Sequence, residues 1–291
     1  MIRPLAKLCT AACLVGTLAV VAPPGASAHE REYAKFNYCP SKTEGVETCL
    51  YSVTNHGKVV LGNKTTPIVN PVTLQGGFSA ENEETHFSSF VGASGAETLS
   101  KTPQPVPGGL AGIVPPESAP PLVKEALKFF FENGLTGVNA TLELARPASE
   151  IQVSNFNILF ESGIALKLPV KVHLENPFLG SSCYVGSSSS PIIWNLTTGT
   201  TSPPGPNTPI AGSSGLASFK EEFRIAELTE NVLVENAWSA PEAKGCGGFP
   251  LELLVDPIIN KISLGDLAAG RNTAILENTI DIASVIAVNN H

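Results

Sequence analysis

Residues Gly163–Asn176, GIALKLPVKVHLEN, carry the clearest structural signal in the chain. Every second residue from Ile164 to Leu174 is apolar, and the odd-numbered positions include Lys171, His173 and Glu175. A period of two over a dozen residues predicts a β-strand with one buried face and one solvent-exposed face. His173 falls on the polar face, so we expect its imidazole to be solvated.

Pro169 qualifies this prediction, because it falls on the polar face of the same strand. A proline has no backbone N–H to donate to a neighbouring strand, so prolines concentrate at bulges and sheet edges. The strand is therefore expected to be bulged at Pro169 or to run partly along an edge.

The remaining sequence predicts a mainly β protein, an antiparallel β-sandwich-like single domain. Glycine (26 residues) and proline (24 residues) are abundant and only 15% of residues are charged, which favours many short strands joined by turns. One or two short helices are expected, at about residues 119–133 and 252–262. In the second, Asp256 is expected as the N-cap residue and Pro257 as the first helical residue.

Two local patterns lead to more detailed predictions. Asn55-His56-Gly57 separates two apolar runs, which predicts a β-hairpin with its turn at Gly57. Further along, apolar residues occupy odd positions up to Val153 and even positions from Phe156 to Phe160. A switch of face by one residue predicts two strand segments with a β-bulge at Ser154-Asn155.

The first 28 residues read as a signal peptide, cleaved after Ala28. Arg3 and Lys7 precede an apolar run, and Ala26-Ser27-Ala28 has the small-x-small pattern of a cleavage site. Residues 29–291 are then the mature protein, which is expected to be secreted and to have no transmembrane segment. Residues 199–215 are rich in Thr, Ser, Pro and Gly and are interpreted as a long loop within one domain, with an interdomain linker as the alternative.

Charge and cysteine content fit an exported protein. Removal of Arg3 and Lys7 from 18 basic residues leaves 16 against 26 acidic residues, a net charge of −10. This acidity argues against nucleic acid as a partner. Four cysteines remain in the mature chain, and an even number in an exported protein predicts disulfides. We favour the pairs Cys39–Cys49 and Cys183–Cys246, out of three possible pairings.

Several segments resemble a family of uncharacterised exported proteins of actinobacterial type. The longest is LPVKVHLENPFLGSSCYVGSSSSPIIWNLTTGTTSPP (Leu168–Pro204), and shorter ones are PVTLQGG (Pro71–Gly77), ENAWSAPEAKGCGG (Glu235–Gly248) and GRNTAIL (Gly270–Leu276). The resemblance implies export. It carries no activity and no catalytic residue that could be transferred to this chain.

No catalytic or metal-binding motif stands out. The Gly-x-Ser-x-Gly motif of serine hydrolases is absent, and no cysteine or histidine spacing indicates a zinc site. Glu143, Glu161 and Glu175 are candidate carboxylates for a glycosidase, but glutamate is too common in the chain for any pair to be specific. We therefore predict no catalytic residue, no metal and no cofactor.

Aromatic residues suggest a binding role. Trp194, Trp238 and Tyr184 are weak candidates for a ligand-contacting patch, and core packing is the alternative for each. The expected function is a non-catalytic binding or structural protein, extracellular or associated with the cell envelope. The alternatives are an extracellular hydrolase of envelope polysaccharide and an amphiphile carrier, which requires an enclosed apolar cavity.

Overall fold

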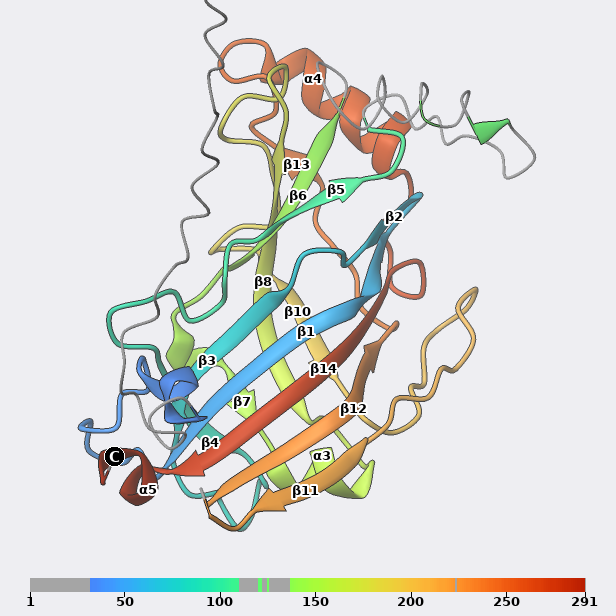
Figure 1. Cartoon of the computed structure of the whole chain (residues 1–291). Helices are drawn as coiled ribbons and strands as arrows, with labels where there is room; N and C mark the ends of the chain where they lie inside the picture. Colours follow the sequence, from blue (N-terminus) through green and yellow to red (C-terminus); the bar gives the residue numbers. More distant parts are fainter. Residues whose placement is uncertain (1–31, 110–119, 122–124, 126–136, 223, 291) are drawn as a thin grey trace, which may run out of the picture.

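The computed structural model describes residues 32–109, 120–121, 125, 137–222 and 224–290. The predicted signal peptide lies outside these residues, and so does nearly all of the helix predicted at 119–133. The remaining secondary structure is mainly β, as predicted (Figure 1). The strands are β1 (Thr48–Leu61), β2 (Lys64–Pro67), β3 (Val72–Phe78), β4 (Ser88–Gly92), β5 (Pro103–Val106), β6 (Val138–Leu144), β7 (Gln152–Val153), β8 (Leu166–Glu175), β9 (Tyr184–Val185), β10 (Ile192–Leu196), β11 (Leu216–Lys220), β12 (Ile225–Glu235), β13 (Ala243–Lys244) and β14 (Thr273–Ser284). The helical segments are η1 (Ala34–Phe36), η2 (Ala148–Glu150), α3 (Asn155–Phe160), α4 (Glu252–Ile258), η3 (Ile259–Leu264, a π-helix) and α5 (Val285–Asn289).

The strands form one antiparallel sheet that folds over into two layers. Its order is β11-β12-β14-β1-β3-β4-β7-β8-β6-β5, with β2 on β1, β10 and β9 on β8, and β13 on β9. The first layer runs from β11 to β3 and the second from β7 to β5, as Figure 1 shows. β4 joins them, since it pairs with β3 at one end and with β7 at the other. The layers meet again where Thr197 and Val234 exchange two backbone hydrogen bonds of 3.0 and 2.9 Å. This arrangement confirms the predicted sandwich-like fold class.

The strand predicted from Gly163–Asn176 is β8, at the centre of the second layer. Its even-numbered residues are buried and face the first layer, as the period of two predicts. Pro169 causes no register shift in the pairing with β10, so neither a bulge nor an edge position explains it. On the other side of β8, β7 pairs up to Lys167 and β6 pairs from Val170 onward. Pro169 lies between these two partners and its carbonyl accepts from Ala145 N, so its missing N–H interrupts no strand pairing.

The hairpin predicted at Asn55-His56-Gly57 is wrong. β1 continues through this segment and pairs with β14 on both sides of it, with a register shift between Thr54 and His56. Gly57 has a φ of +119°. A glycine with positive φ occurs in a β-bulge within one strand as well as in a turn between two strands. The hairpin turn lies at Gly62-Asn63 instead, between β1 and β2.

The bulge predicted at Ser154-Asn155 is also wrong, because the chain enters helix α3 there. Ser154 is the N-cap, and its Oγ accepts a hydrogen bond of 3.1 Å from Asn157 N. Ile158 is buried, whereas Phe156 and Phe160 are exposed and their rings lie 4.6 Å apart. The apolar residues whose alternation suggested a strand therefore lie on a short helix, and only Ile158 among them faces inward.

The helix predicted at about 252–262 is present as α4 and η3, but its start was assigned wrongly. The helix begins at Glu252, and Pro257 lies inside it. Asp256 is not an N-cap, since its carboxylate accepts hydrogen bonds from Gly245 N (3.1 Å) and Cys246 N (2.7 Å). It therefore fixes the helix to the loop that carries Cys246.

Both predicted disulfides are present. The Cα atoms of Cys39 and Cys49 are 5.6 Å apart and those of Cys183 and Cys246 are 4.1 Å apart. Residues 199–215 lie between the second pair and are held to their surroundings by hydrogen bonds. Ser214 donates from its N and Oγ to Glu161 Oε1, and Ser213 N donates to Val232 O.

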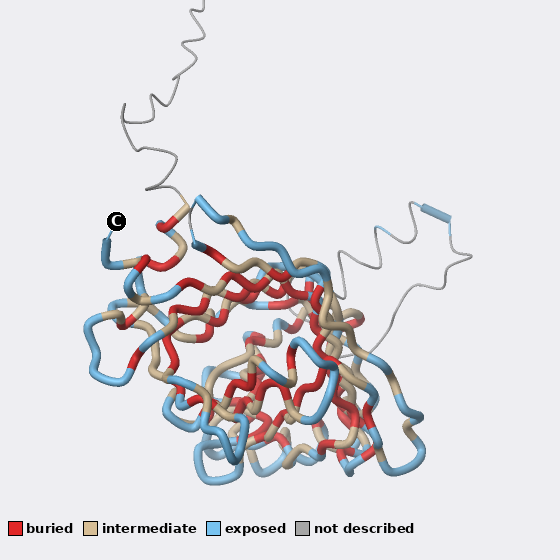
Figure 2. The backbone as a smooth tube through the Cα atoms, turned by 90° about the horizontal axis from the view of Figure 1, so that it is seen from below, coloured by how far each residue is buried: buried red, intermediate tan, exposed pale blue. Residues whose placement is uncertain are grey.

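The main hydrophobic core lies between the two layers. Figure 2 shows the buried residues along the facing strands and the exposed residues mostly in the loops. A smaller cluster packs around the Cys39–Cys49 disulfide, η1 and α5. No helix of the described residues is long and apolar enough to cross a bilayer.

Candidate functional site

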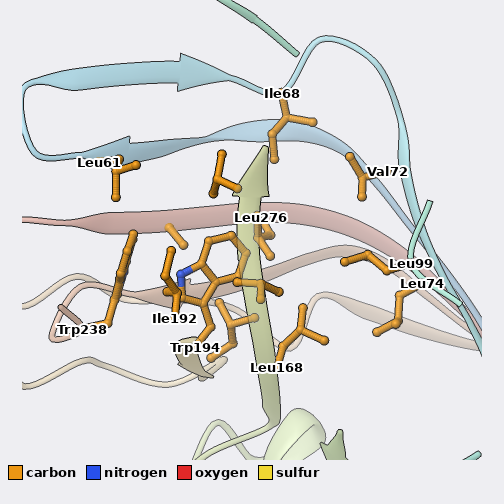
Figure 3. Packing of buried hydrophobic residues seen from close by; sticks show 14 of the residues in the cluster. Leu61, Ile68, Val72, Leu74, Leu99, Leu168, Ile192, Trp194, Trp238 and Leu276 are labelled. Atoms are coloured by element: carbon orange, nitrogen blue, oxygen red, sulfur yellow. The ribbon is translucent and has the colours of Figure 1, made fainter. Parts of the chain in front are cut away.

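A cavity of about 120 Å³ lies between the two layers. Its walls are mostly apolar and come from both layers, because the inward positions of β1, β3, β6, β8 and β14 alternate along each strand. In Figure 3, Leu61, Ile68 and Leu74 approach it from the first layer, and Leu168 and Trp194 from the second. An engineered apolar cavity of about 150 Å³ is enough to hold a benzene molecule, so this space suits a small apolar group or part of a chain.

Trp194 forms part of the cavity wall. It is fully buried, and its ring contacts that of Trp238 edge to face at 5.8 Å. The indole nitrogen of Trp194 lies on the Trp238 side of the ring in Figure 3 and has no hydrogen-bond partner among the described residues. Trp238 Nε1 donates to Glu235 O at 3.3 Å, and Trp238 is not among the cavity-lining residues. Of the two tryptophans, only Trp194 is therefore placed to contact a ligand in the cavity.

A buried polar group lies at the wall formed by β1 and β14. Thr54 Oγ1 donates to Asn278 Oδ1 at 2.6 Å, and both residues line the cavity. Asn278 Nδ2 in turn donates to Leu276 O at 3.0 Å. These groups satisfy one another, so they add little polarity to the cavity surface.

Lys64 is the one charged residue among the described residues that line the cavity. It lies on β2 directly after the turn at Gly62-Asn63 and is partly exposed. Lys64 Nζ donates to Gly109 O at 3.2 Å, and no carboxylate of the described residues pairs with it. Burial lowers the pKa of Lys64 below its ordinary value of 10.5. Among the described residues, the cavity thus has a mostly apolar interior and a single ammonium group at the end bordered by the β1–β2 turn.

The same end of the cavity is bordered by η3, which continues helix α4. Ile259 and Leu264 are buried there and face the cavity. The outer surface of this helical segment is also apolar, with Leu254 68% and Ile262 72% exposed. Further exposed apolar residues of this segment and of the loop before it are Phe249, Leu251, Leu253 and Ile258. Several exposed apolar residues on one short segment mark an interaction site more often than a free protein surface.

Tyr184, the third aromatic candidate, lies away from the cavity on the outer face of the second layer. Its ring stacks on His173 at 4.4 Å, and Lys171 Nζ lies 4.1 Å from the ring centre. The structure therefore does not bring Tyr184 together with the tryptophans into one aromatic patch.

The expectation that His173 is solvated is wrong. Its side chain is only 14% exposed, and Nδ1 lies 3.7 Å from both Glu143 Oε1 and Glu175 Oε1. Glu143 is paired with Lys171 at 3.1 Å, and Glu175 accepts from Thr141 Oγ1 at 2.9 Å. Two of the candidate carboxylates thus flank one histidine, on the face of β6 and β8 opposite the cavity.

Glu235 is a buried carboxylate outside the cavity. Its Oε1 accepts from Ala237 N at 2.7 Å. Burial raises the pKa of Glu235 above its ordinary value of 4.5, and the backbone N–H groups of Ala237, Asn195 and Asn236 oppose that rise. No group of three or more metal-binding side chains occurs within the described ranges.

The sequence pointed to Trp194 but not to the rest of the site. Lys64 sits in a short Lys-Thr-Thr-Pro segment with no motif around it, and its inward position follows only from the pairing of β2 with β1. The sequence offers one hint of this position: Lys64, Thr66 and Ile68 are alternate residues, and all three line the cavity.

Comparisons with known protein families, curated proteins and solved structures find no match for this chain, so its resemblance to exported actinobacterial proteins stays a prediction.

Proposed function

We propose that the protein is a secreted, non-catalytic binding protein that holds the apolar part of an amphiphile between its two β-layers. The observation that carries this proposal is the apolar cavity, which has wall residues from both layers and, among the described residues, one cation at its end. Ligand pockets combine mostly apolar walls with a few polar groups that orient the ligand, and this cavity has that composition. The amphiphile carrier and the non-catalytic binding protein expected from the sequence thus become one hypothesis.

Two disulfides support the extracellular part of the proposal. Disulfides persist in oxidising compartments and are rare in the cytosol. Association with the cell envelope is supported by the exposed apolar residues of α4 and η3, because η3 lines one end of the cavity. A ligand that enters at this end would pass directly from an apolar lipid phase into an apolar cavity.

The hydrolase alternative has less support. A glycosidase places two carboxyl groups on opposite sides of a bound sugar. Glu143 and Glu175 lie on one outer face, and each is engaged by a neighbouring side chain, Lys171 and Thr141 respectively. Neither residue lines the cavity described above.

Isothermal titration calorimetry with octan-1-ol tests the proposal, because this ligand has a short apolar chain and no charge. We expect binding with a negative heat-capacity change, the signature of buried apolar surface. Ala140 lines the cavity, so Ala140→Phe fills part of it and should weaken binding by about tenfold or more, the equivalent of ~1.4 kcal/mol.

Ala268→Phe is the matched control, since Ala268 is exposed and does not line the cavity. Thermal unfolding of both variants separates loss of binding from loss of folding. If octan-1-ol does not bind the wild type, or if a folded Ala140→Phe protein binds it as well as the wild type does, the proposed function is wrong.

A further inference from the structure

We infer that the cavity selects amphiphiles with an anionic headgroup, and that the ammonium group of Lys64 binds this headgroup. The inference rests on the proposed function and specifies the class of ligand. The anion in question is a single carboxylate or phosphate at the end of an apolar chain.

The backbone around Lys64 directs its side chain toward the cavity. Lys64, Thr66 and Ile68 are alternate residues, and all three line the cavity. The turn before them is fixed to η3, since Asn63 N donates to Leu264 O at 2.7 Å. Gly62 has a φ of +57°, and a Cβ at this position would collide with the same carbonyl oxygen. Lys64 therefore starts from a rigid turn, which limits where its ammonium group can lie.

The hydrogen bonding of Lys64 leaves room for an anion. An ammonium group has three donors, and Gly109 O accepts one of them at 3.2 Å. No acidic residue is present among the described residues that line the cavity. A partly buried charge without a counter-ion costs free energy, and an anionic ligand would remove that cost. Away from Lys64 the cavity walls are mostly apolar, which suits the apolar chain attached to the headgroup.

The same lysine has another explanation that needs no ligand. Among the described strands, β2 pairs only with β1, and an inward-pointing lysine on an edge strand prevents the edge from pairing with another molecule. This explanation predicts an effect on self-association and none on ligand preference. The two accounts can therefore be distinguished by experiment.

Calorimetric titrations of octanoate and octan-1-ol, which share one chain length, measure the preference for charge. We expect octanoate to bind the wild type about tenfold more tightly than octan-1-ol, the size of one charged hydrogen bond. In Lys64→Met the ratio of the two affinities should fall to about one, because methionine keeps the apolar stem but carries no charge. Lys58→Met is the matched control, since Lys58 is exposed on β1 and does not line the cavity.

Two further arms complete the test. Octyl phosphate compared with octanoate identifies the preferred anion, and acetate and inorganic phosphate test whether the anion binds without a chain. We expect both free anions to bind at least about tenfold more weakly than octanoate, since they bury no apolar surface. In the wild type, raising the salt concentration from about 20 mM to about 500 mM should weaken octanoate binding and leave octan-1-ol binding nearly unchanged.

The results distinguish a failure of the proposed function from a failure of the inference about Lys64. Absence of octan-1-ol binding by the wild type would overturn the proposed function. Equal binding of the two ligands, or an unchanged preference in Lys64→Met, would overturn the inference about Lys64 and leave the proposed function intact. If Lys64→Met self-associates without any change in ligand preference, the role of Lys64 is to prevent the edge strand β2 from pairing with another molecule, and the inference is wrong.

Discussion

Gly57 shows how one residue determines the path of a whole strand. With a φ of +119°, its Cβ would collide with the carbonyl oxygen of Ile275 on β14. β1 and β14 pair on both sides of the bulge, and their close approach at position 57 requires a residue without a side chain. This close backbone approach, rather than a reversal of the chain, is the reason for a glycine after Asn55-His56.

We expect Gly57→Ala to lower the free energy of unfolding by roughly 2–4 kcal/mol, because backbone strain and a backbone collision add together. Gly95→Ala is a suitable control, since Gly95 also has a positive φ (+82°) but no atom within 4 Å of an added Cβ. Urea unfolding of both variants measures the difference. Equal losses in the two variants would show that the collision with Ile275 is relieved at no cost.

Glu235 makes stability depend on pH with a definite sign. Its folded-state pKa is raised above 4.5, so between 4.5 and the raised value the folded state binds more protons than the unfolded state. The contribution of this group to stability is therefore fully present below pH 4.5 and is lost as pH rises through the folded-state pKa.

Urea unfolding of wild type and Glu235→Gln between about pH 4 and pH 7 tests this behaviour. We expect the stability of the wild type relative to Glu235→Gln to be greatest at the acidic end and to decline toward neutral pH. Glu277→Gln serves as the control, because Glu277 is exposed on β14. If the difference in unfolding free energy between wild type and Glu235→Gln does not change with pH, the pKa of Glu235 is not raised in the folded state.

At the scale of elements, α4 and η3 have two apolar surfaces with different partners. The inner surface packs on the cavity through Ile259 and Leu264, and Asp256 holds the helix to the Cys246 loop. The outer surface contacts no other part of the described chain closely enough to bury Leu254 or Ile262. We propose that a lipid surface covers it, because the same segment borders the end of the cavity. Since the mature chain is expected to be acidic, contact would depend on apolar insertion rather than on attraction to anionic lipid.

Co-flotation with neutral phosphatidylcholine vesicles tests the role of this outer surface. We expect Leu254→Ser/Ile262→Ser to bind vesicles at least about tenfold more weakly than the wild type, since each side chain contributes ~1.5–3 kcal/mol when fully buried. Leu216→Ser is the control, because Leu216 is 61% exposed on β11, at the opposite end of the molecule in Figure 1. If Leu254→Ser/Ile262→Ser floats with vesicles as the wild type does, the surface does not contact lipid. The same conclusion follows if the substitutions reduce self-association of the protein and leave vesicle binding unchanged.

At the scale of the whole molecule, the two disulfides stabilise different regions. Cys183–Cys246 closes a separation of 63 residues and joins the second layer to the loop held by Asp256. Cys39–Cys49 closes a separation of only 10 residues and belongs to the smaller hydrophobic cluster. The chain-entropy model gives contributions of roughly 4 and 3 kcal/mol respectively.

We therefore expect Cys183→Ala/Cys246→Ala to lose more stability than Cys39→Ala/Cys49→Ala. Only the first pair should also weaken octan-1-ol binding, because Gly247 N donates to the carbonyl of Leu179, a cavity-lining residue, at 2.7 Å. Denaturant unfolding and calorimetry of both double variants measure the two effects. Equal loss of octan-1-ol affinity in both would show that the cavity responds to global stability alone.

Local patterns in the sequence were reliable where one physical preference acted alone. The alternation of β8 follows from burial on one face, and Cys39 and Cys49, only 10 residues apart, form a local pair. Predictions failed where two preferences gave the same pattern. An apolar alternation at Phe156 and Ile158 fits a strand, but the hydroxyl of Ser154 caps a helix there. A glycine after Asn55-His56 fits a turn, but β14 requires a bulge at this position.

The sequence by itself determined the class of fold and the chemical character of the chain. Period-two burial, many turn residues and four cysteines in the predicted mature chain are local or compositional properties, so no knowledge of the other strands was needed to interpret them. The tertiary structure alone decided the site. The cavity is formed by residues as far apart as Leu61, Trp194 and Leu276, and Lys64 faces it only because β2 pairs with β1 and its turn is fixed to η3. Contacts of this kind depend on how the sheet folds into two layers, which no local pattern specifies.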